Sequence, residues 1–90
     1  MQVLKYGIAD AEAKEEWGKP GDGLHGSDLV DAKTHPQARM TVGFTRVDDG
    51  ERMRAAFPYD EVMVLLQGSV MVEPETGEPF TAHRGDVVYM

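Results

Sequence analysis

The sequence predicts an all-β domain, a barrel or sandwich of short strands with a short helix near the N-terminus. Runs of β-branched and aromatic residues recur along the C-terminal two thirds, separated by Gly- or Pro-containing turns at intervals of roughly 8 to 12 residues. Helix-forming composition is confined to the N-terminal quarter. Ninety residues fit one domain, 1–90. Within it we distinguish an N-terminal extension, residues 1–33, and the barrel strands, residues 34–90.

The N-terminal helix is predicted by the run AEAKEEW, with Asp10 before it as the N-cap and Gly18 after it as the stop signal. The following stretch GKPGDGLHG, residues 18–26, holds four glycines and one proline, which predicts a loop. SDLVDA is ambiguous. His35 precedes a proline, which disfavours a helical conformation, so KTHPQ predicts a turn.

From Arg39 onward the pattern changes to that of strands and turns. RMTVGFTRV is rich in β-branched and aromatic residues, and DDG closes it as a tight turn. The next segment, ERMRAAF, is ambiguous between strand and irregular structure. Four further strands follow, with turns between them: EVMVLLQ, SVMVEP, FTAH and VVYM. EVMVLLQ is almost continuously apolar, which indicates burial on both faces or a covered outer face.

Composition excludes several function classes. Nine Lys and Arg against sixteen Asp and Glu give a net charge of −7, which disfavours nucleic-acid partners. The absence of cysteine removes disulfides, thiolate metal sites and thiol nucleophiles. No apolar run is long enough to span a bilayer, and the first residues do not form a signal peptide. We therefore expect a cytoplasmic protein with no membrane partner.

A spaced set of residues carries a family resemblance. Six residues separate Glu61 from Gly68, and Gly85-Asp86 opens the last strand. This spacing resembles the two sequence motifs of the cupin superfamily, which are small jelly-roll barrels. The wording YDEV, VLLQGSVMVE and GDVVYM is most similar to the small cupins of ethanolamine utilisation. Over residues 34–90 the resemblance implies a cupin-like jelly roll, which we expect to be C-terminally incomplete.

The chain departs from the cupin motifs at the metal ligands. The histidine pair of the first motif falls on residues 54–57, which read RAAF, and the chain ends before the proline, glycine and histidine of the second motif. Glu61 alone matches a ligand, so we expect no metal and no other cofactor. A metal site that combines Glu61 with His25 or His35 is the alternative. The open end at Met90 indicates either a homodimer that closes the barrel or a cut in a longer protein.

The candidate site residues follow from strand alternation. Glu61, Met63 and Leu65 share one face, so Glu61 is expected to point into the barrel and to hold a ligand hydroxyl or amine, or to act as general acid or base. Tyr59 is offset by two residues and is expected on the same face. We take Glu61 and Tyr59 as candidate catalytic residues, and Glu61, Met63 and Arg46 as ligand-binding residues. The alternative places Glu61 at a solvated strand end, paired with Arg54 or Arg46.

Three functions stay open at this point. The first is a small cupin that binds a small polar or carboxylate metabolite, related to ethanolamine or other small-metabolite catabolism. The second is a metal-dependent cupin enzyme, an isomerase or dioxygenase, with an altered ligand set. The third is a non-catalytic interaction or scaffold module whose barrel is a packed core. A stoichiometric metal in the purified protein would distinguish the second function from the first. A small molecule that stabilises the fold would distinguish the first function from the third.

Overall fold

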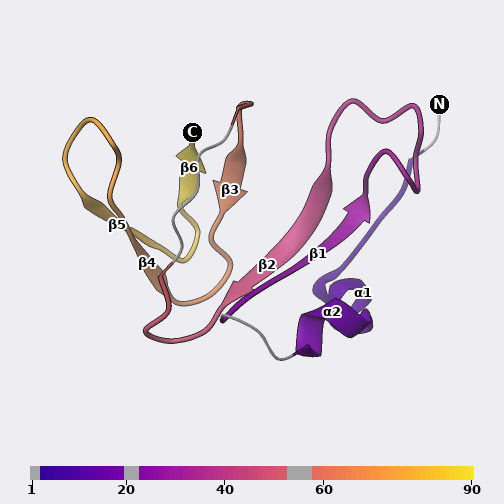
Figure 1. The fold of residues 1–90 in the computed structure, drawn as a ribbon, viewed down its shortest axis with the longest axis horizontal. Helices are drawn as coiled ribbons and strands as arrows, with labels where there is room; N and C mark the ends of the chain where they lie inside the picture. Colours follow the sequence, from indigo (N-terminus) through magenta and orange to yellow (C-terminus); the bar gives the residue numbers. More distant parts are fainter. Residues whose placement is uncertain (1–2, 20–22, 53–57) are drawn as a thin grey trace. The chain divides into compact units, whose positions relative to one another are not determined.

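The computed structural model describes residues 3–19, 23–52 and 58–90, drawn as a ribbon in Figure 1. These residues fall into two compact units, 1–54 and 55–90. The described residues form six short strands, arranged as three two-stranded antiparallel sheets, and two short helices. The prediction of an all-β class with a helical N-terminal segment is confirmed. Neither of the described helices has the length or the apolar content needed to cross a bilayer.

The sheet of the N-terminal unit pairs β1 (Leu24–Val30) with β2 (Val42–Val47). Every second residue of β1 is buried: His25, Ser27 and Leu29. This strand corrects the predicted loop over residues 18–26, since its first three residues lie there. Alternation did not reveal the strand because two of its three buried positions are polar and a glycine separates them.

The two strands of this sheet approach each other closely at Gly43. A Cβ atom on Gly43 would lie 2.5 Å from the carbonyl oxygen of Ser27. Next to this point the register shifts, because Leu29 has no partner between the pairs Asp28↔Gly43 and Val30↔Val42. The missing side chain of Gly43 therefore permits the strand pairing that continues into the bulge.

The helical segment is split into α1 (Ile8–Glu12) and α2 (Glu15–Gly18), both of which pack against β1 (Figure 1). Asp10 is not the N-cap, which corrects the prediction. Gly7 occupies that position, and its backbone N–H donates to the Asp10 carboxylate at 2.7 Å. The break falls at Lys14, whose backbone is extended and whose Nζ donates to the carbonyl oxygen of Asp28 at 2.7 Å.

The C-terminal unit contains the four strands predicted from alternation and turns. They are β3 (Val62–Val64), β4 (Ser69–Val72), β5 (Phe80–His83) and β6 (Val87–Tyr89). β3 pairs with β6, and β4 pairs with β5. Its most buried apolar residues are Ala82 and Val88.

These four strands act as one long, kinked hairpin. Backbone hydrogen bonds extend the β3–β6 ladder to Leu65 and Asp86, after which residues 66–68 stand opposite residues 84 and 85. The extra residue forms a bulge. Each arm of the hairpin has a glycine with positive φ at this bulge, Gly68 at 77° and Gly85 at 92°. The predicted turn RGD is confirmed, with the Asp86 N–H donating to the His83 carbonyl at 2.9 Å.

Candidate functional site

Glu61 lies one residue before β3 and is fixed there by the backbone. Its N–H and C=O both hydrogen bond to Met90 at 2.9 Å, which adds one pair to the β3–β6 ladder. Glu61, Met63 and Leu65 are half-buried, whereas the intervening Val62 and Val64 are exposed. The predicted sharing of one face by Glu61, Met63 and Leu65 is therefore confirmed.

The surroundings of the Glu61 side chain are apolar. Its cross-strand partner is Met90, and the next pair along the ladder joins Met63 to Val88, which is 6% exposed. Among the described residues no hydrogen bond or ion pair reaches the Glu61 carboxylate. A half-buried carboxylate beside two thioethers and a valine can accept a charge-assisted hydrogen bond from a ligand amine or hydroxyl. We call Glu61, Met63, Val88 and Met90 the Glu61 strip.

Tyr59 lies in a bend ahead of the ladder and is 63% exposed. Strand alternation, which was the basis for placing it on the face of Glu61, therefore does not extend to it. Its role as a catalytic residue stays a prediction.

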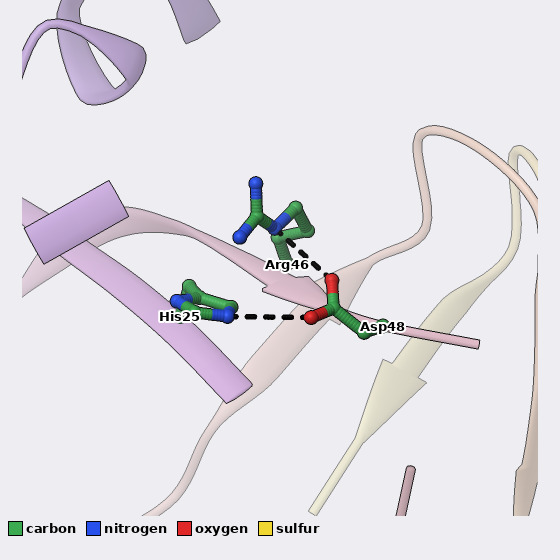
Figure 2. Close-up of polar contacts among 3 residues, drawn as sticks. All are labelled: His25, Arg46 and Asp48. Atoms are coloured by element: carbon green, nitrogen blue, oxygen red, sulfur yellow. Dashed lines mark ion pairs between the residues drawn. The ribbon is translucent and has the colours of Figure 1, made fainter. Parts of the chain in front are cut away.

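Arg46 lies in the N-terminal unit, half-buried on β2, on the same face as Phe44 as predicted. Its Nε lies 3.4 Å from Asp48 Oδ1, and its guanidinium carbon lies 5.5 Å from the centre of the Trp17 ring. His25, the cross-strand partner of Arg46, places its Nε2 3.4 Å from the other oxygen of Asp48. Figure 2 shows the Asp48 carboxylate between the two side chains, with one oxygen facing each.

The metal ligands of the cupin motifs do not fit this chain. Among the described residues, no three His, Asp or Glu side chains come close enough together to hold an ion. Residues 53–57, which include the positions of the motif's histidine pair, lie outside the described residues. Glu61 has apolar side chains on its face where a metal site would need further donors. We therefore derive no chemistry through a metal.

Sequence reasoning brought Glu61 and Met63 together but missed Trp17 and Asp48, and it considered His25 only as a metal ligand beside Glu61. The pairing of β1 with β2 sets His25 beside Arg46, and the split of the helical segment sets Trp17 over the guanidinium group. The one available signal was the alternation of His25, Ser27 and Leu29, which the surrounding glycines obscured.

Comparison with known proteins identifies a family for residues 35–90. A family model described as "EutQ-like cupin domain" matches residues 35–90. No curated protein and no solved structure gives a significant match. The matched residues include β2, the Glu61 strip and the two glycines of the kinked hairpin. Because the match spans more than half of the chain, the protein belongs to the family of EutQ-like cupin domains.

Proposed function

We propose that this cupin domain binds a small polar metabolite through the Glu61 strip. The observation that carries the proposal is the half-buried Glu61 carboxylate, which has no partner among the described residues and stands at the end of an apolar row. A half-buried carboxylate without a donor among the described residues can accept a hydrogen bond from a ligand amine or hydroxyl. Met63 and Met90 are flexible apolar side chains that adapt to the carbon skeleton of such a ligand.

The ligand class follows from the charge of its receptor. A lone carboxylate attracts an ammonium or hydroxyl group and repels a carboxylate group. We therefore favour a small amine or amino alcohol at this strip, in keeping with a role near the catabolism of ethanolamine or related metabolites. General acid or base catalysis by Glu61 would require a reactive group on the same ligand. Ligand binding is therefore tested before catalysis.

The test is thermal unfolding of the full chain with ethanolamine and with glycolate as probes. Ethanolamine at ten times its Kd should stabilise the wild type by about 1.4 kcal/mol, which raises the Tm by several degrees. Glu61→Gln should abolish that rise, because the amide carries no charge to hold the ammonium group. Glu75→Gln, which changes an exposed carboxylate of the same unit, should retain it.

Two results would count against the proposal. One is an ethanolamine response of Glu61→Gln equal to that of the wild type. The other is stabilisation by glycolate alone, which would mean that the receptor is cationic and is not Glu61.

We also infer that two copies of the chain associate through the outward face of the β3–β6 sheet. Its cross-strand pairs are Val62↔Tyr89 and Val64↔Val87, and all four side chains are more than half exposed. This face carries no charged residue in the ladder, whereas the chain has a net charge of −7. Two copies that meet here avoid placing like charges opposite one another, which favours a symmetric contact over other surfaces.

A further inference from the structure

The N-terminal unit contains a second group of polar side chains, which the Glu61 proposal does not use. We call Trp17, His25, Ser27, Arg46 and Asp48 the Arg46 cluster. His25 and Ser27 are neighbours on the buried face of β1, 6% and 1% exposed. Arg46 stands across from His25, and Asp48 follows β2 with its backbone N–H bonded to the Gly23 carbonyl at 2.8 Å. The cluster is thus held by the strand pairing itself.

Arg46 is oriented on two sides. Asp48 lies 3.4 Å from its Nε, and its guanidinium carbon lies over the Trp17 ring, 5.5 Å from the ring centre. Its two terminal nitrogens lie on the side away from Asp48 (Figure 2) and have no partner among the described residues. The side chain is 40% exposed, so this edge is accessible. An arginine held in this way loses little conformational freedom when it binds a planar or tetrahedral oxyanion.

The unsatisfied groups of the cluster are donors. Ser27 Oγ is a buried atom without a hydrogen bond among the described residues, whereas the buried Arg46 Nε has the ion-pair contact with Asp48 at 3.4 Å. Buried polar atoms in folded proteins are nearly always hydrogen-bonded, so the Ser27 hydroxyl indicates a missing partner. Arginine has no acceptor, and the hydroxyl of Ser27 is free to donate. One acceptor group therefore satisfies both the Ser27 hydroxyl and the terminal nitrogens of Arg46.

We propose that the Arg46 cluster binds a small oxyanion, a carboxylate or a phosphate group, through Arg46 and Ser27. Asp48 neutralises part of the charge of Arg46 and fixes its orientation, and Trp17 excludes water from one face of the guanidinium group. The oxygens of the ligand accept charge-assisted hydrogen bonds from Arg46. The planar guanidinium group can donate two parallel hydrogen bonds to two oxygens of one carboxylate or phosphate group.

The chain offers a direct probe of this site, because Trp17 is its one tryptophan and stacks on Arg46. Sodium succinate and sodium phosphate are titrated separately into the full chain at constant ionic strength, with sodium chloride as the balancing salt. Trp17 fluorescence should change in a saturable manner with one of them, and the active salt identifies the carboxylate or the phosphate group as the ligand. Chloride alone should give no saturable change.

Four variants separate binding from folding, and circular dichroism checks each fold. Arg46→Gln should weaken binding about tenfold or more, and Arg46→Lys, which keeps the charge without the fork, should also weaken it. Ser27→Ala should weaken it about fivefold. Without added anion Ser27→Ala should be at least as stable as the wild type, because it removes an unsatisfied buried hydroxyl. Arg39→Gln, an exposed arginine of the same unit, should bind like the wild type.

The proposal fails if neither salt produces a saturable change of Trp17 fluorescence. It also fails if Arg46→Gln and Arg39→Gln respond alike, since the anion would then act through general screening of charge. If Arg46→Gln does not fold, Arg46→Lys and Ser27→Ala decide, and wild-type affinity in both contradicts the site.

Discussion

Glu61 differs from the other carboxylates of its unit in its surroundings and not in its chemistry. Glu73, Glu75 and Glu78 are exposed in or beside the loop between β4 and β5, whereas Glu61 is half-buried in a ladder of apolar residues. A carboxylate in water gains little from a ligand amine, because water already solvates it. At Glu61 the same group has fewer water contacts and no protein partner among the described residues, so the same hydrogen bond contributes more to binding.

Asp31 provides a residue-scale prediction about pH. Its carboxylate accepts hydrogen bonds from the backbone N–H groups of Thr34 and Lys33 at 2.9 Å, and closes the turn before His35. The Thr34 N–H chiefly, with the Lys33 N–H and the Thr34 hydroxyl, holds the pKa of Asp31 below its ordinary value of 3.8. Because the folded-state pKa is the lower one, the stabilisation is fully present above pH 3.8 and is lost as the pH falls through the folded-state pKa.

The variant Asp31→Asn should therefore have a lower Tm than the wild type at pH 7. This difference should narrow as the pH falls below about 4, since Asp31 takes up a proton first in the unfolded state and, at still lower pH, in the folded state. Asp49→Asn, which alters an exposed carboxylate in another turn, is the control. A Tm difference for Asp31→Asn that stays constant from pH 7 to pH 3 would contradict the role of the charge.

At the scale of elements, the kinked hairpin accounts for the spacing of the family glycines. Gly68 and Gly85 sit on opposite sides of the same bulge, and each has positive φ. At the bulge the two arms of the hairpin continue from the β3–β6 sheet into the β4–β5 sheet. The six residues between Glu61 and Gly68 therefore correspond to the stretch of chain between Glu61, at one end of the β3–β6 ladder, and the bulge at its other end.

Gly85→Ala should destabilise the hairpin through its backbone. Its φ of 92° is unfavourable for any residue with a Cβ, while no atom lies within 4 Å of the Cβ that alanine would add. The expected loss is about 1–2 kcal/mol in the free energy of unfolding, measured by urea denaturation. Gly18→Ala at the end of α2 also meets no atom and lacks a positive φ, so it should be neutral or slightly stabilising. Equal stability of the two variants would show that the turn is not strained by a side chain.

The four strands of residues 62–89 could be predicted because local signals agree with the fold. Apolar residues alternate or run together, and each turn carries a glycine or proline where the chain reverses. β1 could not be predicted, since its buried positions hold His25 and Ser27 and the strand is recognisable only beside β2. The helix was predicted as one element because helix propensity is local, whereas Lys14, at the break, contacts Asp28 of β1, which is distant in the sequence.

The candidate site was predictable to the same extent. The Glu61 strip lies within one ladder, so strand alternation and a family motif were sufficient to place Glu61 with Met63. The Arg46 cluster joins three separate segments, around residues 17, 25 and 46, and no sequence spacing brings these together. Such a cluster becomes visible once the pairing of β1 with β2 is known.

At the scale of the whole molecule, charge and apolar surface lead to a prediction about association. Val64→Asp adds a negative charge on the outward face of the β3–β6 sheet, and a symmetric dimer would contain it twice. The wild type should sediment as a dimer at micromolar concentrations, and Val64→Asp should raise the dimer Kd by about tenfold or more. Met71→Asp, which alters an exposed apolar residue of β4, should leave the Kd unchanged. A wild-type monomer at all concentrations, or equal effects of the two variants, would contradict this interface.

The most direct test of the central claim is the ¹³C NMR signal of the Glu61 side-chain carboxyl, assigned by its loss in Glu61→Gln and followed while ethanolamine is added. If the carboxylate receives the ligand, its chemical shift moves to saturation at the ligand concentration that raises the Tm, while that of the exposed Glu75 stays in place. If the Glu61 signal moves no more than the Glu75 signal, the Glu61 strip is not the binding site.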